Sequence, residues 1–195
     1  LGDCLCARNC LDFCIQLVGA KPCCEDCNEP IVPRGIEMRG CTPQQESDLW
    51  RSYHTMCRYL FKRCTTSECL QGVDDGIVKC LRAFCEGKRK LAIRCLGRSR
   101  NPFYALLYYL ACVRGSGGAF VMGPWNIIYV CPGIFPCSVL TNSNGFRLDC
   151  CQVALMEEMV HLCQGWWWGQ RPEGRAKAIV GGCYPNAGMC GLEGY

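Results

Sequence analysis

The chain has 195 residues, a formal net charge of +4 and 22 cysteines. This length allows a substantial core, and 5 Trp, 8 Tyr and 7 Phe argue against a thiol-rich metal store, which needs no core. The modest charge gives little support to nucleic-acid binding, and we expect no nucleic-acid partner.

Cysteine is the dominant feature of the composition. It makes up about one residue in nine, more than the roughly 8–10% that marks a disulfide scaffold, and the even count permits complete pairing. Because disulfides persist in oxidising compartments, the sequence predicts a secreted, extracellular protein. The chain begins at Leu1 without an initiator Met, a start that a cleaved signal peptide or a trimmed sequence would leave.

Metal binding is the alternative use of the cysteines. Cys24 and Cys27 have the spacing of a zinc-finger pair. With only 2 His in the chain, mixed Cys/His sites are scarce. We therefore expect disulfides, and neither a metal nor another cofactor.

The first 41 residues contain two predicted segments. Asp3 can cap a helix that ends at Gly19, with apolar residues at helical spacing between them. Residues 20–41 contain three prolines and the adjacent Cys23 and Cys24, which predicts a loop held by disulfides.

The clearest predicted element begins at Thr42. Thr42 and Gln45 have the spacing of a capping box, and Pro43 stands at the first helical position. An apolar stripe continues behind them to Cys64, so the helix is predicted to reach that residue. The stripe consists of Leu49, Trp50, Tyr53, Met56, Cys57, Leu60, Phe61 and Cys64.

Two further helical regions are predicted before residue 114. The first covers residues 67–97, with Asp74 and Asp75 at the start of its helix. The second, from Phe103 to Val113, is apolar on nearly every side and is predicted to lie at the centre of the fold. The buried face of the first region is predicted to consist of Ile77, Val78, Leu81, Phe84 and Cys85.

The segment from Gly115 to Phe146 carries no charged residue. Prolines and glycines break it too often for a membrane helix, and it predicts short strands at 119–122, 127–130 and 138–140. Buried, these strands would complete a core. Partly exposed, they would imply assembly with other copies, which their unprotected, uncharged edges favour.

The C-terminal part is predicted to contain one more helix. Asp149 can cap it, and the apolar pattern continues through Cys163 to a glycine at 165. The residues from Trp166 onward are predicted to form a glycine-rich, loop-like tail held by Cys183 and Cys190.

These segments predict an α+β fold that is mostly helical. We expect a small, disulfide-rich extracellular fold with a short-strand apolar segment. Residues 1–100 would form a cysteine-rich helical region. Residues 101–195 would add the apolar helix, the short strands, the last helix and the stapled tail, and the two parts would make one compact domain.

The motif from His54 to Tyr59, His-Thr-Met-Cys-Arg-Tyr, resembles the active-site helix of the secreted phospholipases A2. His54, Cys57 and Tyr59 match that pattern, which implies a disulfide-rich, helical, calcium-dependent hydrolase. Thr55 stands where the family has its calcium-ligating Asp, Trp50-Arg51 replaces its cysteine pair, and no glycine-rich calcium loop precedes the motif. Without that carboxylate calcium lacks its anchor.

His54 is therefore expected to be a residue at the helix surface or at its boundary with the core, and the protein is not expected to be an enzyme. Glu157 and His161 lie one turn apart on the last predicted helix, a spacing that suits a structural side-chain pair. No nucleophile or phosphate-loop motif accompanies them.

A basic stretch between residues 88 and 100 is the main charge feature. It would attract an anionic glycan, a membrane surface or an acidic receptor face. A dibasic processing site at Lys88-Arg89 and an ordinary solvated surface are the alternatives. The candidate anion-binding residues are Lys88, Arg89, Lys90, Arg94, Arg98 and Arg100.

Three consecutive tryptophans at 166–168 could stack on a sugar, enter a membrane interface, contact another subunit or pack on the core. Together with the uncharged segment they define a predicted assembly interface. Its residues are Phe120, Val121, Trp125, Ile127, Ile128, Tyr129, Ile134, Phe135, Trp166, Trp167 and Trp168.

The sequence therefore predicts a non-enzymatic extracellular structural protein that self-assembles into an oligomer or filament. The alternative is a secreted toxin or defence effector that binds a receptor or an anionic membrane surface.

Overall fold

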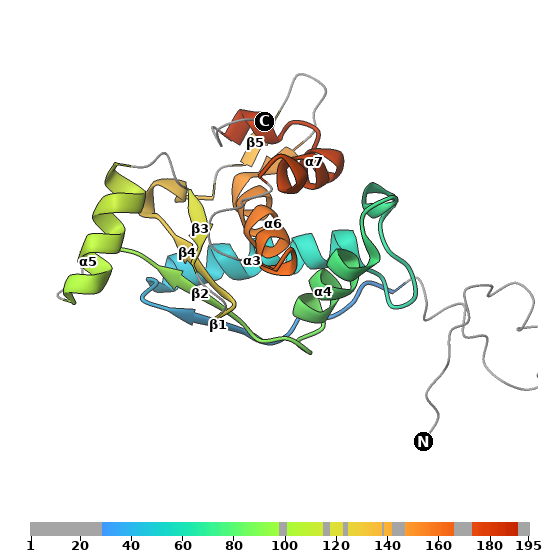
Figure 1. Ribbon diagram of the computed structural model, residues 1–195, viewed down its shortest axis with the longest axis horizontal. Coiled ribbons are helices and arrows are strands. Elements are labelled where there is room, and N and C mark those ends of the chain that lie inside the picture. The colour runs from blue at the N-terminus through green and yellow to red at the C-terminus, as the bar shows by residue number, and fades with distance from the viewer. Residues whose placement is uncertain are drawn as a thin grey trace, which may run out of the picture.

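The computed structural model describes residues 29–97, 101–114, 118–122, 125–137, 139–141, 147–165 and 173–190. Its main body is a small mixed sheet with helices packed against it (Figure 1). The α+β class is confirmed. The predicted helix at 3–19, the tryptophans at 166–168 and the arginines at 98 and 100 lie outside the described residues.

The sheet has four strands in the order β1-β2-β4-β3. Strands β1 (Ile36–Arg39), β2 (Leu91–Cys95) and β4 (Ile127–Val130) run parallel, and β3 (Ala119–Val121) pairs antiparallel with β4. A separate antiparallel pair is formed by β5 (Val139–Thr141) and β6 (Arg147–Asp149). The predicted strands at 119–122, 127–130 and 138–140 are confirmed as β3, β4 and β5.

Along the chain, helical segments connect these strands and follow the last of them. The longest of the described helices is α3 (Pro43–Leu60), which contacts α6 (Cys150–Cys163), and α6 in turn contacts α4 (Asp75–Cys85) and β3. The remaining helical segments are η1 (Glu68–Leu70), α5 (Pro102–Tyr108), the π-helical η2 (Tyr109–Val113), η3 (Pro132–Ile134), α7 (Glu173–Cys183) and η4 (Ala187–Cys190).

Alternation along the strands gives the sheet an inner and an outer face. Ile93, Ile128 and Val121 lie at matching register positions on the inner face and belong to the hydrophobic core with residues of α3, α4 and α6. Arg94 and Tyr129 are register partners on the outer face. The core therefore lies on one side of the sheet, and polar and aromatic side chains lie on the other.

The capping box predicted at Thr42 is confirmed. The Gln45 amide donates to Thr42 Oγ1 at 3.3 Å, and the Thr42 amide donates to Gln45 Oε1 at 2.9 Å. The helix ends earlier than predicted, at Leu60 rather than at Cys64, because Phe61 is extended and pairs with Thr66 in a short bridge. Phe61 is still buried. Its apolar side chain therefore reflects a position in the core and does not indicate that the helix continues.

Replacing Thr42 by Ala is expected to lower the free energy of unfolding by about 1 kcal/mol, because it removes the capping oxygen. Urea unfolding without reductant measures the loss. Thr55→Ala is the matched control, since Thr55 is exposed in the middle of the same helix and alanine favours a helix interior. Equal losses in the two variants would contradict a role for the cap.

The predicted helical region at 67–97 is correct for η1 and α4 and wrong for β2. Gly87, with a φ of +72°, follows α4 closely and turns the chain back. Strand β2 then alternates buried and half-buried residues. Within the predicted loop at 20–41, residues 36–39 form β1 instead.

Two predictions for the second half of the chain are also wrong. Helix α5–η2 does not lie at the centre of the fold: none of its residues is buried, and it stands at one end of the molecule (Figure 1). The tail contains helix α7 in addition to its loop residues. The last predicted helix is confirmed as α6 with its Asp149 cap, whose carboxylate accepts from the amides of Cys151 and Gln152.

Disulfides join segments that are far apart in the sequence. All fifteen cysteines that the structure describes are disulfide-bonded, Cys64 among them. The predicted attachments of the tail through Cys183 and Cys190 are confirmed. The seven described pairs are Cys41–Cys95, Cys57–Cys85, Cys69–Cys183, Cys80–Cys163, Cys112–Cys131, Cys137–Cys151 and Cys150–Cys190.

Candidate functional site

Helix α5–η2 exposes a row of large apolar side chains to solvent, which we call the apolar ridge. Its members recur at helical spacing, with exposed fractions between 45% and 57%. No charged residue occurs from Asn101 to Val113. The ridge consists of Phe103, Leu106, Tyr109, Leu110 and Val113.

The opposite side of the same helix attaches it to the sheet. The Arg94 guanidinium of β2 lies 4.3 Å from the centre of the Tyr104 ring, within the range of a cation–π contact. The Cys112–Cys131 disulfide joins the end of the helix to the residue that follows β4. At its start the Asn101 side chain accepts from the Phe103 amide at 3.0 Å. The helix is therefore fixed in place while the ridge stays exposed.

Some described residues of the predicted assembly interface are buried in the fold, and others are half-buried or exposed. Val121, Ile128 and Tyr129 are buried and so do not contribute to a surface. Trp125 is 65% exposed. Phe120, Ile127, Ile134 and Phe135 are half-buried, and Phe120 stacks on Tyr129 at a ring distance of 5.3 Å.

Among the described residues, five exposed large apolar side chains therefore share the helix before the uncharged segment 115–146, whereas within the described part of that segment Trp125 is the large apolar residue that is exposed. The sequence did contain a signal for this surface. A helix that is apolar on nearly every side is either buried all round or attached by one side only, and the sequence pattern alone does not distinguish these two arrangements.

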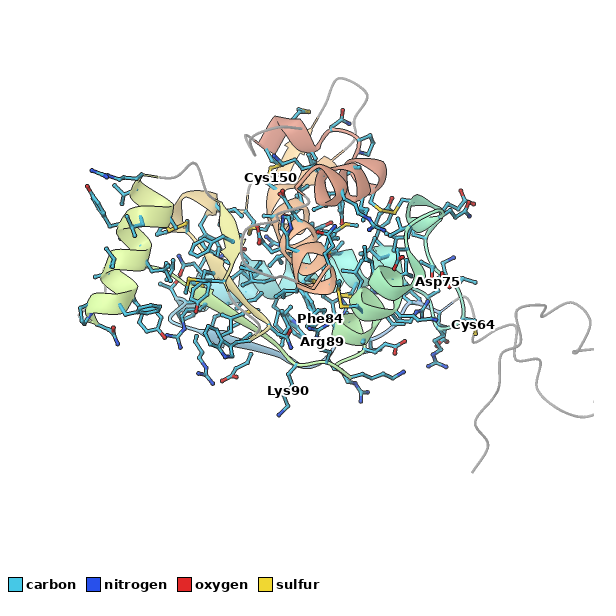
Figure 2. The ribbon with its side chains drawn as sticks, viewed as in Figure 1. Cys64, Asp75, Phe84, Arg89, Lys90 and Cys150 are labelled. Atoms are coloured by element: carbon cyan, nitrogen blue, oxygen red, sulfur yellow. A yellow bond between two sulfur atoms is a disulfide. The ribbon has the colours of Figure 1, made fainter. Side chains whose placement is uncertain are left out.

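The basic stretch is also divided. Lys88 forms an ion pair with Glu86 at 2.7 Å. Arg89 is used internally: it donates to Asn126 Oδ1 at 2.7 Å and lies over the Phe84 ring at 4.6 Å. Lys90 is exposed and points away from the ribbon (Figure 2).

Arg94 lines a cavity of about 330 Å³ at the carboxyl ends of β1 and β2. Arg39, which the sequence prediction omitted, lines the same cavity from β1. The two arginines are register partners on neighbouring parallel strands. The full lining consists of Arg39, Gly40, Arg94, Cys95, Leu96, Gly97 and Tyr104.

His54 is half-buried on α3, and its ring centre lies 6.2 Å from that of Trp50. Thr55 beside it is exposed. Within the described ranges, Cys137, Asp149 and Cys151 are the one group close enough to hold a metal ion, and a disulfide between the two cysteines removes their thiolates. The described residues therefore place no metal-binding group at His54.

The chain matches no family model, none of the curated proteins and none of the solved structures. In the part of the chain that the structure describes, no helix is both long enough and apolar enough to cross a membrane.

Proposed function

We propose that this protein is a secreted, non-enzymatic structural protein that self-associates through the apolar ridge on α5–η2. The observation that carries the proposal is the exposure of five large apolar side chains in one row. Monomeric proteins rarely leave a continuous apolar surface of this kind in water, and such surfaces mark interaction sites. The proposal moves the predicted interface from the strands to the neighbouring helix.

A second copy of the same helix is a suitable partner. Twelve residues of helix are about 18 Å long, and a two-fold axis across the ridge would place the two rows against each other in antiparallel orientation. The helix is uncharged from Asn101 to Val113, so the pairing brings no like charges together. Arg114, just beyond the ridge, lies 5.3 Å from the centre of the Tyr109 ring and would remain at the rim.

The density of disulfides supports the extracellular part of the proposal. Seven described bridges join the helices, the sheet and the tail, and such frameworks form and persist in oxidising compartments. A heavily cross-linked protomer also suits a structural role, because local opening costs more when the chain is closed into loops.

The double substitution Leu106→Lys/Leu110→Lys is expected to convert an oligomer into a monomer of 21.8 kDa. Light scattering of the native, unreduced protein over a range of concentrations measures the change. Both side chains are more than half exposed, so the fold should tolerate lysine. Val32→Lys is the control, because Val32 is an exposed apolar residue outside the ridge, at 64%.

A wild-type protein that remains monomeric at millimolar concentration would refute self-association. If that monomer then bound anionic vesicles and the double variant did not, the ridge would be a lipid-binding surface. The alternative of an effector that acts on a membrane would then take precedence. The observation that favours this alternative is the aromatic content of the helix, since interfacial helices combine aromatic residues with basic neighbours.

A further inference from the structure

The cavity at the carboxyl ends of β1 and β2 has the position of a ligand site. In open parallel sheets, ligands bind beyond the carboxyl ends of the strands, where the strand order reverses. The order does not reverse between β1 and β2, so the charge and the walls of this cavity must carry the assignment. Here β1 ends at Arg39 and β2 at Cys95, and the next residues of both strands line the cavity. Its volume of about 330 Å³ falls at the lower end of the range for small-molecule pockets.

The charge of the cavity is unbalanced. Arg39 and Arg94 lie side by side on strands about 4.8 Å apart, an arrangement of like charges that is unfavourable without a counter-charge. Glu37 supplies one to Arg39, whose Nε and Nη2 both lie 2.7 Å from Glu37 Oε1. None of the residues that line the cavity is acidic.

Arg94 has no such partner. Among the described residues none forms an ion pair or a hydrogen bond with its guanidinium, which lies over the face of the Tyr104 ring and interacts electrostatically with Tyr129. Stacking uses the face of a guanidinium and leaves the N–H groups at its edge able to donate. The half-buried Arg94 therefore offers a fork of donors beside the cavity with no acceptor from the described chain.

The walls of the cavity are held rigidly. The Cys41–Cys95 disulfide joins the two strand ends. Gly40 has a φ of +70°, and a Cβ there would lie 3.0 Å from the Cys95 carbonyl oxygen, so the two backbones approach closely at this edge. A cavity fixed in this way loses little entropy when a ligand enters.

We propose that this cavity binds a phosphate monoester. The Arg94 fork would hold two phosphate oxygens, because guanidinium and phosphate match in bidentate geometry. The donors of Arg39 not engaged by Glu37 would hold a third oxygen. Leu96 and Tyr104 line the same cavity and provide apolar area for the esterified group. The phosphate can belong to a free small molecule or to a phosphatidic acid headgroup, and the test separates these two sources.

Isothermal titration of the unreduced protein with inorganic phosphate and with phenyl phosphate, in a buffer without oxyanions, measures the affinity. Both are expected to bind saturably at one site per chain, and phenyl phosphate is expected to bind more tightly. Arg94→Gln should weaken binding at least tenfold, and Arg39→Gln severalfold. Arg58→Gln is the matched control, because Arg58 is exposed on α3 and is not one of the residues that line the cavity, and it should leave the affinity unchanged.

Two further measurements make the result decisive. Amide resonances of Gly40, Leu96 and Gly97 should shift on titration of the wild-type protein, which tests the site even if Arg94→Gln does not fold. Sedimentation with vesicles containing phosphatidic acid, compared with vesicles containing phosphatidylserine, identifies a headgroup as the source if the vesicles with phosphatidic acid are bound preferentially.

Absence of saturable phosphate binding, or equal affinities of Arg94→Gln and Arg58→Gln, would overturn the proposal. The Leu106→Lys/Leu110→Lys variant should still bind phosphate, so failure of self-association would not affect this inference.

Discussion

Removing the Cys69–Cys183 disulfide by replacing both residues with Ala is expected to lower the free energy of unfolding by about 4 kcal/mol. The bridge spans 114 positions of sequence, and closing a loop of that length restricts the unfolded chain by about 5 kcal/mol. The neighbouring Cys80–Cys163 bridge shortens the loop that is actually closed to about 30 residues, which reduces the expected contribution to about 4 kcal/mol.

Urea unfolding without reductant measures this loss, and a second bridge serves as the control. Cys137–Cys151 spans 14 positions and is expected to contribute about 3 kcal/mol, so its removal should cost less. Equal or reversed losses would show that strain or residual structure in the unfolded chain, and not loop length, determines what each bridge contributes.

Helix starts were predictable from the sequence because their signals are local. Thr42 with Gln45, and Asp149 with the two amides that follow it, each lie within one turn of the backbone groups they satisfy. Helix ends were less predictable. The apolar pattern that continues through Phe61 records burial, and burial is compatible with both a helix and an extended residue.

Strands β1 and β2 were missed because their pairing is not local. Each is at most five residues long, and parallel partners need a long crossover between them. Helices α3 and α4 form the crossover from β1 to β2. In β2 buried and half-buried residues alternate, which is the period-2 pattern of a strand. A pattern of only five residues, however, is too short to distinguish a strand from a turn of helix in the sequence.

The candidate sites depend on the same long-range pairings. Arg39 and Arg94 become neighbours only through the parallel register of β1 and β2, so no spacing in the sequence could have joined them. The apolar ridge is a different case. Its residues were all identified as apolar, but the sequence does not tell which side of a helix faces water when nearly every side is apolar.

The two sites share one structural element. Tyr104 lines the cavity, and the ridge begins at its neighbour Phe103. The Cys112–Cys131 and Cys41–Cys95 disulfides hold the helix and the strand ends on either side. In addition to stabilising the fold, the two disulfides therefore hold the apolar ridge and the cavity in place through contacts between residues that are distant in the sequence.

Alkaline pH is expected to destabilise the protein steeply because of two buried tyrosines. Burial raises the pKa of Tyr53, and burial together with the neighbouring Tyr59 and Asp149 raises the pKa of Tyr184. In the unfolded chain both pKa values are about 10. Their stabilising effect is complete below pH 10, where both states are protonated. Above it the unfolded state loses protons that the folded state keeps, so stability falls as pH rises towards the folded pKa values.

The expected slope is about 1.4 kcal/mol per pH unit for each tyrosine, or nearly 3 kcal/mol per unit for the pair. Urea unfolding at pH 8 and at half-unit steps above pH 10 measures this slope, with short incubations to preserve the disulfides.

Tyr53→Phe is the informative variant. It removes a 2.8 Å hydrogen bond to the Phe84 carbonyl oxygen, so at pH 8 it should be about 1 kcal/mol less stable than wild type. Above pH 10 its slope should be smaller than that of the wild type by about 1.4 kcal/mol per pH unit, and its stability should therefore overtake that of the wild type near pH 11. Parallel curves for variant and wild type would show that Tyr53 ionises as freely in the folded protein as in water.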